Sequence, residues 1–209
     1  MREVALQSIY LSLIGEAVAR LDSAEEFLSN QSGLPHLEAA ILQVRKALES
    51  FALAAIAPDK KEYQAFRATA SKDPDFTKDY HAAKIFGALS RVNPDFYPKP
   101  LLPAARQADG SWHYGEKQSG FLSKKRFERG YDRLGKHLHA HNPWGTSKNL
   151  QNLRNELPSI IREARSLLEL HARFIRTPEF HGVWIVEART SVPTVVSATA
   201  AGPYTVRAG

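Results

Sequence analysis

Hydrophobic side chains recur at intervals of three or four residues along three long segments, at residues 6–21, 37–55 and 150–174. This spacing places the apolar positions on one face of an α-helix. They are Leu6, Tyr10, Leu13, Ala17 and Leu21 in the first segment, Leu37, Ile41, Val44, Leu48, Phe51 and Ala55 in the second, and Leu150, Leu153, Leu157, Ile160, Ala164, Leu167, His171 and Phe174 in the third. Because each apolar face needs a helix to cover it, we expect these segments to form the core of one bundle.

Weaker patterns fill the middle of the chain. Residues 58–70 and 73–92 each favour a shorter helix, whereas residues 92–119 contain four prolines and two glycines and show no sustained period. A connection of that length is usually functional or disordered. We expect its aromatic side chains to fasten it to the domain rather than to stack on a ligand; they are Phe96, Tyr97, Trp112 and Tyr114. After it, Ser123 is suited to cap a helix that runs to about His141, where Asn142-Pro143 stops it.

The C-terminal part of the chain changes to a β-rich composition. The segments GVWIVEA and PTVVSATA are separated by RTSV, which predicts a β-hairpin from about residue 182 to 199. The fold class is therefore mainly α, a helical bundle with a small C-terminal β-hairpin. We assign residues 1–176 to the bundle and residues 177–209 to a hairpin and tail packed on the same domain. Pro158 should kink or divide the last helix, and His171 on its apolar face is interpreted as a hydrogen-bonded core histidine.

Composition narrows the chemistry. The chain has no cysteine, which excludes disulfides, thiolate metal sites and cysteine nucleophiles. Glu3, Gln7 and Glu16 interrupt the apolar N-terminal segment at helical spacing. We therefore expect a core helix there, no membrane contact, and a cytoplasmic protein.

Positive charge is concentrated in one segment. Residues 121–154 hold eight Lys and Arg residues against two acidic ones, while the rest of the chain carries 20 of each sign. The whole net charge of +6 therefore belongs to this segment. A one-sided block of charge favours an anionic partner, with phosphate as the obvious candidate. The alternative is a solvated basic helix with no ligand.

The same segment holds a cluster of histidines, RLGKHLHAHNPWG at residues 133–145. His137 and His141 are four residues apart and would share a helix face, as two metal ligands should. However, no third ligand follows at the right spacing, and Arg133 and Lys136 would repel a divalent cation. We therefore expect no metal and no cofactor.

Arginine beside histidine suits phosphodiester chemistry without a metal. Histidine can take a proton from a ribose 2′-OH or give one to the leaving oxygen, because its ordinary pKa lies near neutrality. Arginine can hold the phosphate and stabilise the negative charge that develops on it. Because the nucleophile is the substrate's own hydroxyl, such a site would cleave RNA and leave DNA intact.

Arg133 and His139 are separated by five residues within a predicted helical bundle, and His139 lies in the segment LHAHNP that ends the predicted helix. This arrangement resembles the HEPN superfamily, over roughly residues 1–176. The resemblance implies a metal-independent endoribonuclease of toxin–antitoxin or antiphage-defence type, active as a homodimer and controlled by an antitoxin or a defence-complex partner. It also implies that Arg133 positions the phosphate and His139 acts as acid or base. The substrate-binding candidates around them are Arg129, Lys136, His137, His141 and Trp144.

Two function classes therefore stand side by side. The first is the RNA-cleaving enzyme; the second is a non-catalytic HEPN-like module that binds nucleic acid, a nucleotide or a partner protein through the same basic surface. In a straight helix, residues six positions apart point about 240° apart. We therefore expect Arg133 and His139 to converge only across a two-fold axis that brings residues 121–145 of two copies together.

Overall fold

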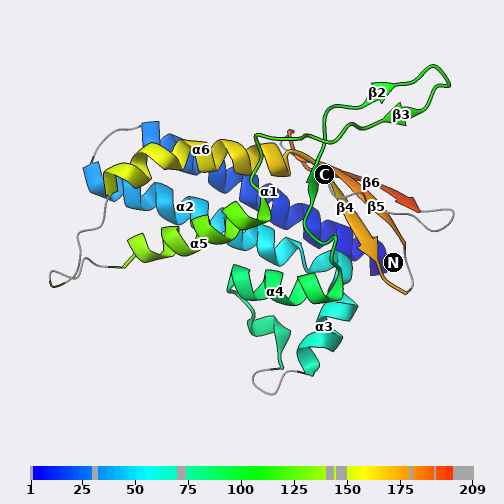
Figure 1. The fold of residues 1–209 in the computed structure, drawn as a ribbon, viewed down its shortest axis with the longest axis horizontal. Helices are drawn as coiled ribbons and strands as arrows, with labels where there is room; N and C mark the ends of the chain where they lie inside the picture. The colour runs from blue at the N-terminus through cyan, green and yellow to red at the C-terminus, as the bar shows by residue number, and fades with distance from the viewer. Residues whose placement is uncertain are drawn as a thin grey trace.

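The computed structural model describes residues 2–29, 33–69, 74–139, 144, 150–178, 181–190 and 192–199. Figure 1 shows a helical body with a small sheet at one end and a hairpin that projects from it. The helices are α1 (Arg2–Ser29), α2 (Gly33–Ala54), η1 (Ala57–Asp59), α3 (Lys60–Ala68), η2 (Phe76–Lys78), α4 (Ala82–Val92), α5 (Lys124–His137) and α6 (Leu150–Leu168). The strands are β1 (Lys99–Pro100), β2 (Ala105–Arg106), β3 (Trp112–His113), β4 (Leu170–Arg176), β5 (His181–Glu187) and β6 (Thr194–Thr199).

The predicted helical core is present. The α1 positions Tyr10, Ala17 and Leu21 are buried, and they pack in one cluster with the apolar faces of α2 and α6. α1 and α2 form a long helical hairpin, and α6 lies along it (Figure 1). Gly33 begins α2 with a φ of 78°, a left-handed conformation that favours glycine. Pro158 lies inside α6, which the structure describes as one helix and not as two.

The C-terminal prediction was correct in part. β5 and β6 pair as the expected antiparallel hairpin, but they belong to a four-stranded antiparallel sheet in the order β1-β4-β5-β6. The last helix was predicted to include His171 and Phe174, and this was wrong, because α6 ends at Leu168 and residues 170–176 form β4. In β4 every second residue faces the helical core. A helix over the same residues would bury several of the same positions, so the apolar pattern fits both structures. Trp184 and Val186 of β5 join the same core.

The long connection contains short strands instead of a structureless loop. Phe96 is buried and Tyr97 packs against the core, where their rings contact Phe86 edge to face, so these two residues fasten the segment as expected. Trp112 does not, because 64% of its surface is exposed on the projecting β2–β3 hairpin.

α1 is also long and apolar enough, by length and composition, to cross a membrane. The core helix of a globular protein passes the same test, and α1 packs through Tyr10, Ile14 and Leu21 against the helical core. Its N-terminal half leaves Val4 and Ile9 exposed.

His171 is a buried, hydrogen-bonded histidine, as predicted, although it lies in β4 and not in a helix. Its Nδ1 is 2.9 Å from the carbonyl oxygen of Leu168, and its Nε2 is 2.7 Å from the hydroxyl of Tyr10. Because a carbonyl can only accept, Nδ1 carries the proton and Nε2 accepts from Tyr10. Burial in the core, together with the positive charge of Arg173, lowers the pKa of His171 from 6.5 to about 4.

This histidine should make stability depend on pH. Between about pH 6.5 and pH 4 the unfolded chain binds a proton at His171 that the folded protein does not, so the free energy of unfolding should fall as pH falls, by up to about 3 kcal/mol. Urea denaturation at several pH values measures this slope. His171→Gln should flatten it over that window, whereas His113→Gln, at an exposed position, should leave it unchanged. An equal slope in the His171 variant would contradict the assignment.

Candidate functional site

α5 has an apolar face and a cationic face. Its Ser123 cap accepts a hydrogen bond from the backbone N–H of Arg126, as the sequence predicts. Phe127, Tyr131 and Leu134 are buried against the core, at intervals of four and three residues. Leu134, next to Arg133, is therefore a core residue, and the arginines on either side of this seam point to the surface.

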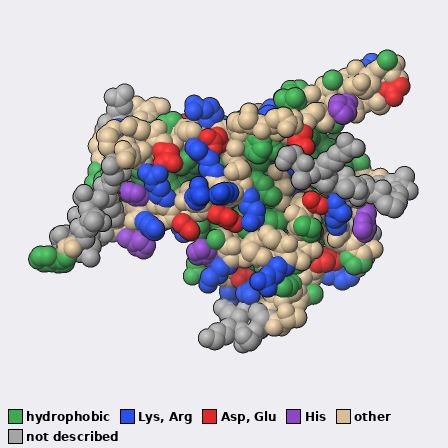
Figure 2. Space-filling model, in the orientation of Figure 1, with side chains coloured by type: hydrophobic (Ala, Val, Ile, Leu, Met, Phe, Trp, Pro, Cys, Tyr) green, Lys and Arg blue, Asp and Glu red, His purple; other side chains and the backbone are tan. Residues whose placement is uncertain are grey.

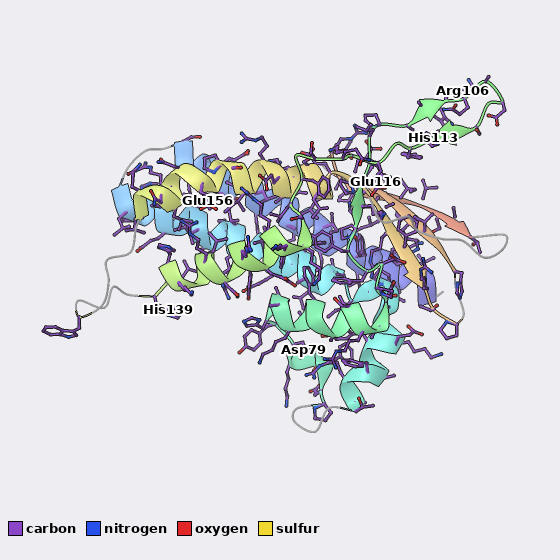
Figure 3. The ribbon with its side chains drawn as sticks, viewed as in Figure 1. Asp79, Arg106, His113, Glu116, His139 and Glu156 are labelled. Atoms are coloured by element: carbon purple, nitrogen blue, oxygen red, sulfur yellow. The ribbon has the colours of Figure 1, made fainter. Side chains whose placement is uncertain are left out.

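α5 ends sooner than predicted. The helix stops at His137 rather than near His141, and the backbone N–H of Leu138 closes its last turn on the carbonyl of Gly135. His139 therefore lies beyond the helix, and it is exposed. Figure 3 shows it past the end of α5, on the side away from Glu156 of α6.

Gly135 serves packing and does not break the helix. A Cβ at this position would collide with the guanidinium of Arg45 from α2. That guanidinium lies 4.0 Å from the ring centroid of Tyr131 and donates to the Tyr131 carbonyl at 3.0 Å and hydroxyl at 2.8 Å. The glycine thus allows α2 to hold α5 through one arginine.

Two ion pairs connect α5 to α6. Arg126 lies 2.6 Å from Glu163, and Arg133 pairs with Glu156. The partners are seven residues apart on both helices, so the two pairs lie two turns apart along antiparallel helices. Figure 2 shows the resulting face, where basic side chains gather over α5 with acidic ones among them.

A hollow of about 480 Å³ lies between these two pairs. We call it the α5–α6 groove; its lining is Ser123, Lys125, Arg126, Arg129, Gly130, Arg133, Glu156 and Ile160. Midway between the two pairs, Arg129 and Gly130 of α5 lie opposite Ile160 of α6. An apolar residue therefore stands where a third carboxylate would continue the series, and no described carboxylate pairs with Arg129.

The groove is suited to an anion. Gly130 has open space where a side chain would lie, and the buried Ile160 forms an apolar wall. Around this space stand four cationic and one acidic side chain. A phosphate there would meet Arg129 directly, with Lys125 and the two ion-paired arginines as further donors. Within the described part of the chain, no group of three His, Asp or Glu side chains could hold a metal ion.

The structure brings only some of the predicted residues together. Arg129 and Arg133 line the groove. Lys136 is exposed in the last turn of α5, and His137, at its end, is half-buried. Trp144 is 93% exposed, and His141 lies outside the described residues.

Most residues of the groove were not predicted from the sequence as parts of a site. Lys125 and Arg126 were counted as charge but not assigned to a site, and Gly130, Glu156 and Ile160 were not considered as parts of one. A signal was available, because Arg126 and Arg133 repeat the seven-residue spacing of Glu156 and Glu163. The matching spacing predicts ion pairs only if the two helices pack side by side, and the sequence alone does not establish that packing.

Comparison with known proteins gives no relative: no family model matches the chain, and neither the curated proteins nor the solved structures contain a match. Function is therefore inferred from the geometry of the groove.

The two glycines of α5 provide a matched test of this geometry. Gly130→Ala should stabilise the protein by about 1 kcal/mol, because alanine is the better helix former and its methyl group enters open space. Gly135→Ala should show no such gain, because the methyl group displaces Arg45 from Tyr131. Thermal or urea unfolding of both variants measures the difference. Equal effects at the two positions would show that Arg45 does not hold α5 in this way.

Proposed function

We propose that the protein is a non-catalytic module that binds the phosphate groups of RNA along the α5–α6 groove. The observation that carries this proposal is Arg129, whose guanidinium faces a hollow beside Gly130 and has no described carboxylate partner. Its neighbours Arg126 and Arg133 are neutralised in part by Glu163 and Glu156. Phosphate suits a row of arginines, because each guanidinium can donate two parallel hydrogen bonds to it.

The charge distribution supports a polyanion over a single small ligand. The groove follows α5 for more than two turns, and Lys136 extends the cationic row beyond it. Successive phosphates of one strand can therefore meet successive cations. Binding of this kind releases counterions and weakens steeply with salt.

Arg129→Gln tests the groove. Loss of a charge-assisted contact should weaken binding of a single-stranded RNA by at least about 10-fold. It should also reduce the log–log salt slope by about 0.7, the value for one phosphate on a single strand. Fluorescence anisotropy at several salt concentrations measures both quantities.

The matched control is Arg162→Gln, which removes an exposed cation from α6 outside the groove lining. This variant should bind like the unaltered protein. Equal losses of RNA affinity in the two variants would show that only net charge matters. If the affinity of the unaltered protein does not change with salt concentration, the reason for proposing a nucleic-acid ligand is lost.

An endoribonuclease is the second candidate, and one observation favours it. His139 lies beyond the end of α5, exposed to solvent, so a substrate that occupies the groove of a second copy can reach it. In this proposal Arg133 holds the scissile phosphate and His139 moves the proton to or from the ribose 2′-OH or the leaving oxygen. Arg133 would have to exchange Glu156 for phosphate, and two copies would have to align α5 about a two-fold axis.

Cleavage separates the two candidates. Total RNA incubated with the protein and a chelator should be degraded if His139 is catalytic, and His139→Ala should abolish that activity while RNA still shifts on a gel. His181→Ala is the matched control, an exposed histidine that lies in β5 and not near α5 in the sequence. Intact RNA with the unaltered protein, together with a gel shift, would leave the binding module as the function.

A further inference from the structure

Glu156 gives the α5–α6 groove a hydrogen-bond acceptor. Of the described residues that line the groove, it is the only acidic one, and Figure 3 shows it on α6. Its Oε2 atom accepts a hydrogen bond from Arg133, whereas its Oε1 atom accepts none from the described residues and is accessible to solvent. An ionised carboxylate can accept through both of its oxygens. The groove therefore offers an unused acceptor beside its cations.

Glu163, at the other end of the groove, has no such free oxygen. Its Oε1 atom accepts a hydrogen bond from the Ser159 hydroxyl at 3.0 Å, and its Oε2 atom lies 2.6 Å from Nε of Arg126. Its side chain is 18% exposed, against 35% for Glu156, and it is not part of the groove lining. Glu163 therefore holds α5 and α6 together, and Glu156 is the acid that a ligand in the groove meets.

This acid lies close to the phosphate position that Arg129 defines. Arg133, which pairs with Glu156, follows Arg129 by four residues, or about 6 Å along α5. Two negative charges about one helical turn apart repel each other at a protein surface. A strand that brings only phosphates to the groove therefore loses affinity to Glu156, unless it also brings a hydrogen-bond donor to the carboxylate.

We infer that Glu156 accepts a hydrogen bond from the 2′-OH of the ribose beside the phosphate that Arg129 binds, so that the groove selects RNA over DNA. The inference rests on the proposed function, because it needs a strand in the groove. The 2′-OH is the group by which a protein distinguishes RNA from DNA at a given site. Deoxyribose has no donor there, so DNA leaves the carboxylate facing a phosphate.

The groove has room for a sugar between these groups. Gly130 has open space where a side chain would lie, and Ile160 provides an apolar wall on the opposite helix. The volume of about 480 Å³ lies within the range of sites that hold small molecules. A ribose over Gly130 therefore has its carbon atoms against Ile160 and its hydroxyl group toward Glu156.

The amino groups of the bases are the other donors that a strand brings. They occur on adenine, cytosine and guanine in both RNA and DNA, whereas uracil has none. Oligouridine and oligodeoxyuridine of equal length therefore differ only in the 2′-OH. Comparing these two strands separates the sugar from the base as the source of the donor.

Fluorescence anisotropy with these two strands, at one salt concentration, tests the inference. Oligouridine should bind at least about 10-fold more tightly than oligodeoxyuridine, the factor that one hydrogen bond to a charged group supplies. 2′-O-methyl oligouridine keeps the oxygen but cannot donate a hydrogen bond from it. It should therefore bind no more tightly than oligodeoxyuridine.

Glu156→Ala should remove most of this preference. Without the carboxylate, oligodeoxyuridine is no longer repelled and oligouridine loses its acceptor, so the two affinities should come within about 3-fold of each other. Asp132→Ala is the matched control, because it removes an exposed carboxylate from α5 outside the groove lining. It makes the same change in net charge, so both strands should bind more tightly by the same factor and the preference for oligouridine should remain.

The outcomes separate the role of Glu156 from the proposed function. Equal affinity of the unaltered protein for the two strands, a preference that survives Glu156→Ala, or a preference lost equally in Asp132→Ala would overturn the role of Glu156. If Arg129→Gln still weakens the binding of both strands in that case, the groove remains the phosphate site. If neither strand binds, or if Arg129→Gln weakens the binding of neither, the proposed function fails as well.

Discussion

A buried ion pair between Arg173 of β4 and Asp59 of η1 holds the sheet against the helices. Both side chains are inaccessible to solvent, and Arg173 also donates to backbone carbonyls of Asp95, Phe174 and Ala55 at 3.2, 2.9 and 3.3 Å. Asp59 accepts a further hydrogen bond from Asn93. Removal of one partner from such a buried pair typically costs about 3–5 kcal/mol, because the other charge is left buried and uncompensated. The pair therefore fixes β4 of the sheet against η1 and against the chain that follows α4.

The position of the groove follows from this constraint. β4 begins two residues after α6 ends, so fixing the strand also fixes the helix that carries Glu156 and Glu163. The start of α5 is then tied to α6, because the backbone N–H of Leu122 donates to the carbonyl of Glu163 at 2.9 Å. The apolar seam of α5 and the Arg45–Tyr131 contact set its rotation. With both helices oriented, the cations on α5 face the acids on α6, and Arg129 is left opposite Ile160.

The sequence predicted the helical body well because its apolar positions follow helical spacing from one turn to the next. The same reasoning failed at residues 170–176, because Leu170, His171, Ala172, Arg173 and Ile175 are all buried, and a strand buried on both faces has no clear alternation. It also placed the end of α5 too late, since Asn142-Pro143 sets only the last possible end of the helix, whereas α5 ends at His137. Arg129 was predicted as a site residue from the charge of its segment, and Arg133 from its spacing to His139 and the resemblance that rests on that spacing. Glu156 and Gly130 were not, because their importance depends on which helices face each other, and that is decided by contacts distant in sequence such as the Arg173–Asp59 pair.

The decisive measurement is the position of phosphate in a crystal of the protein with a short single-stranded RNA. We expect a phosphate oxygen within hydrogen-bonding distance of the Arg129 guanidinium, between the Arg126–Glu163 and Arg133–Glu156 pairs and above Gly130. RNA bound on another surface, with the α5–α6 groove occupied only by solvent, would contradict it.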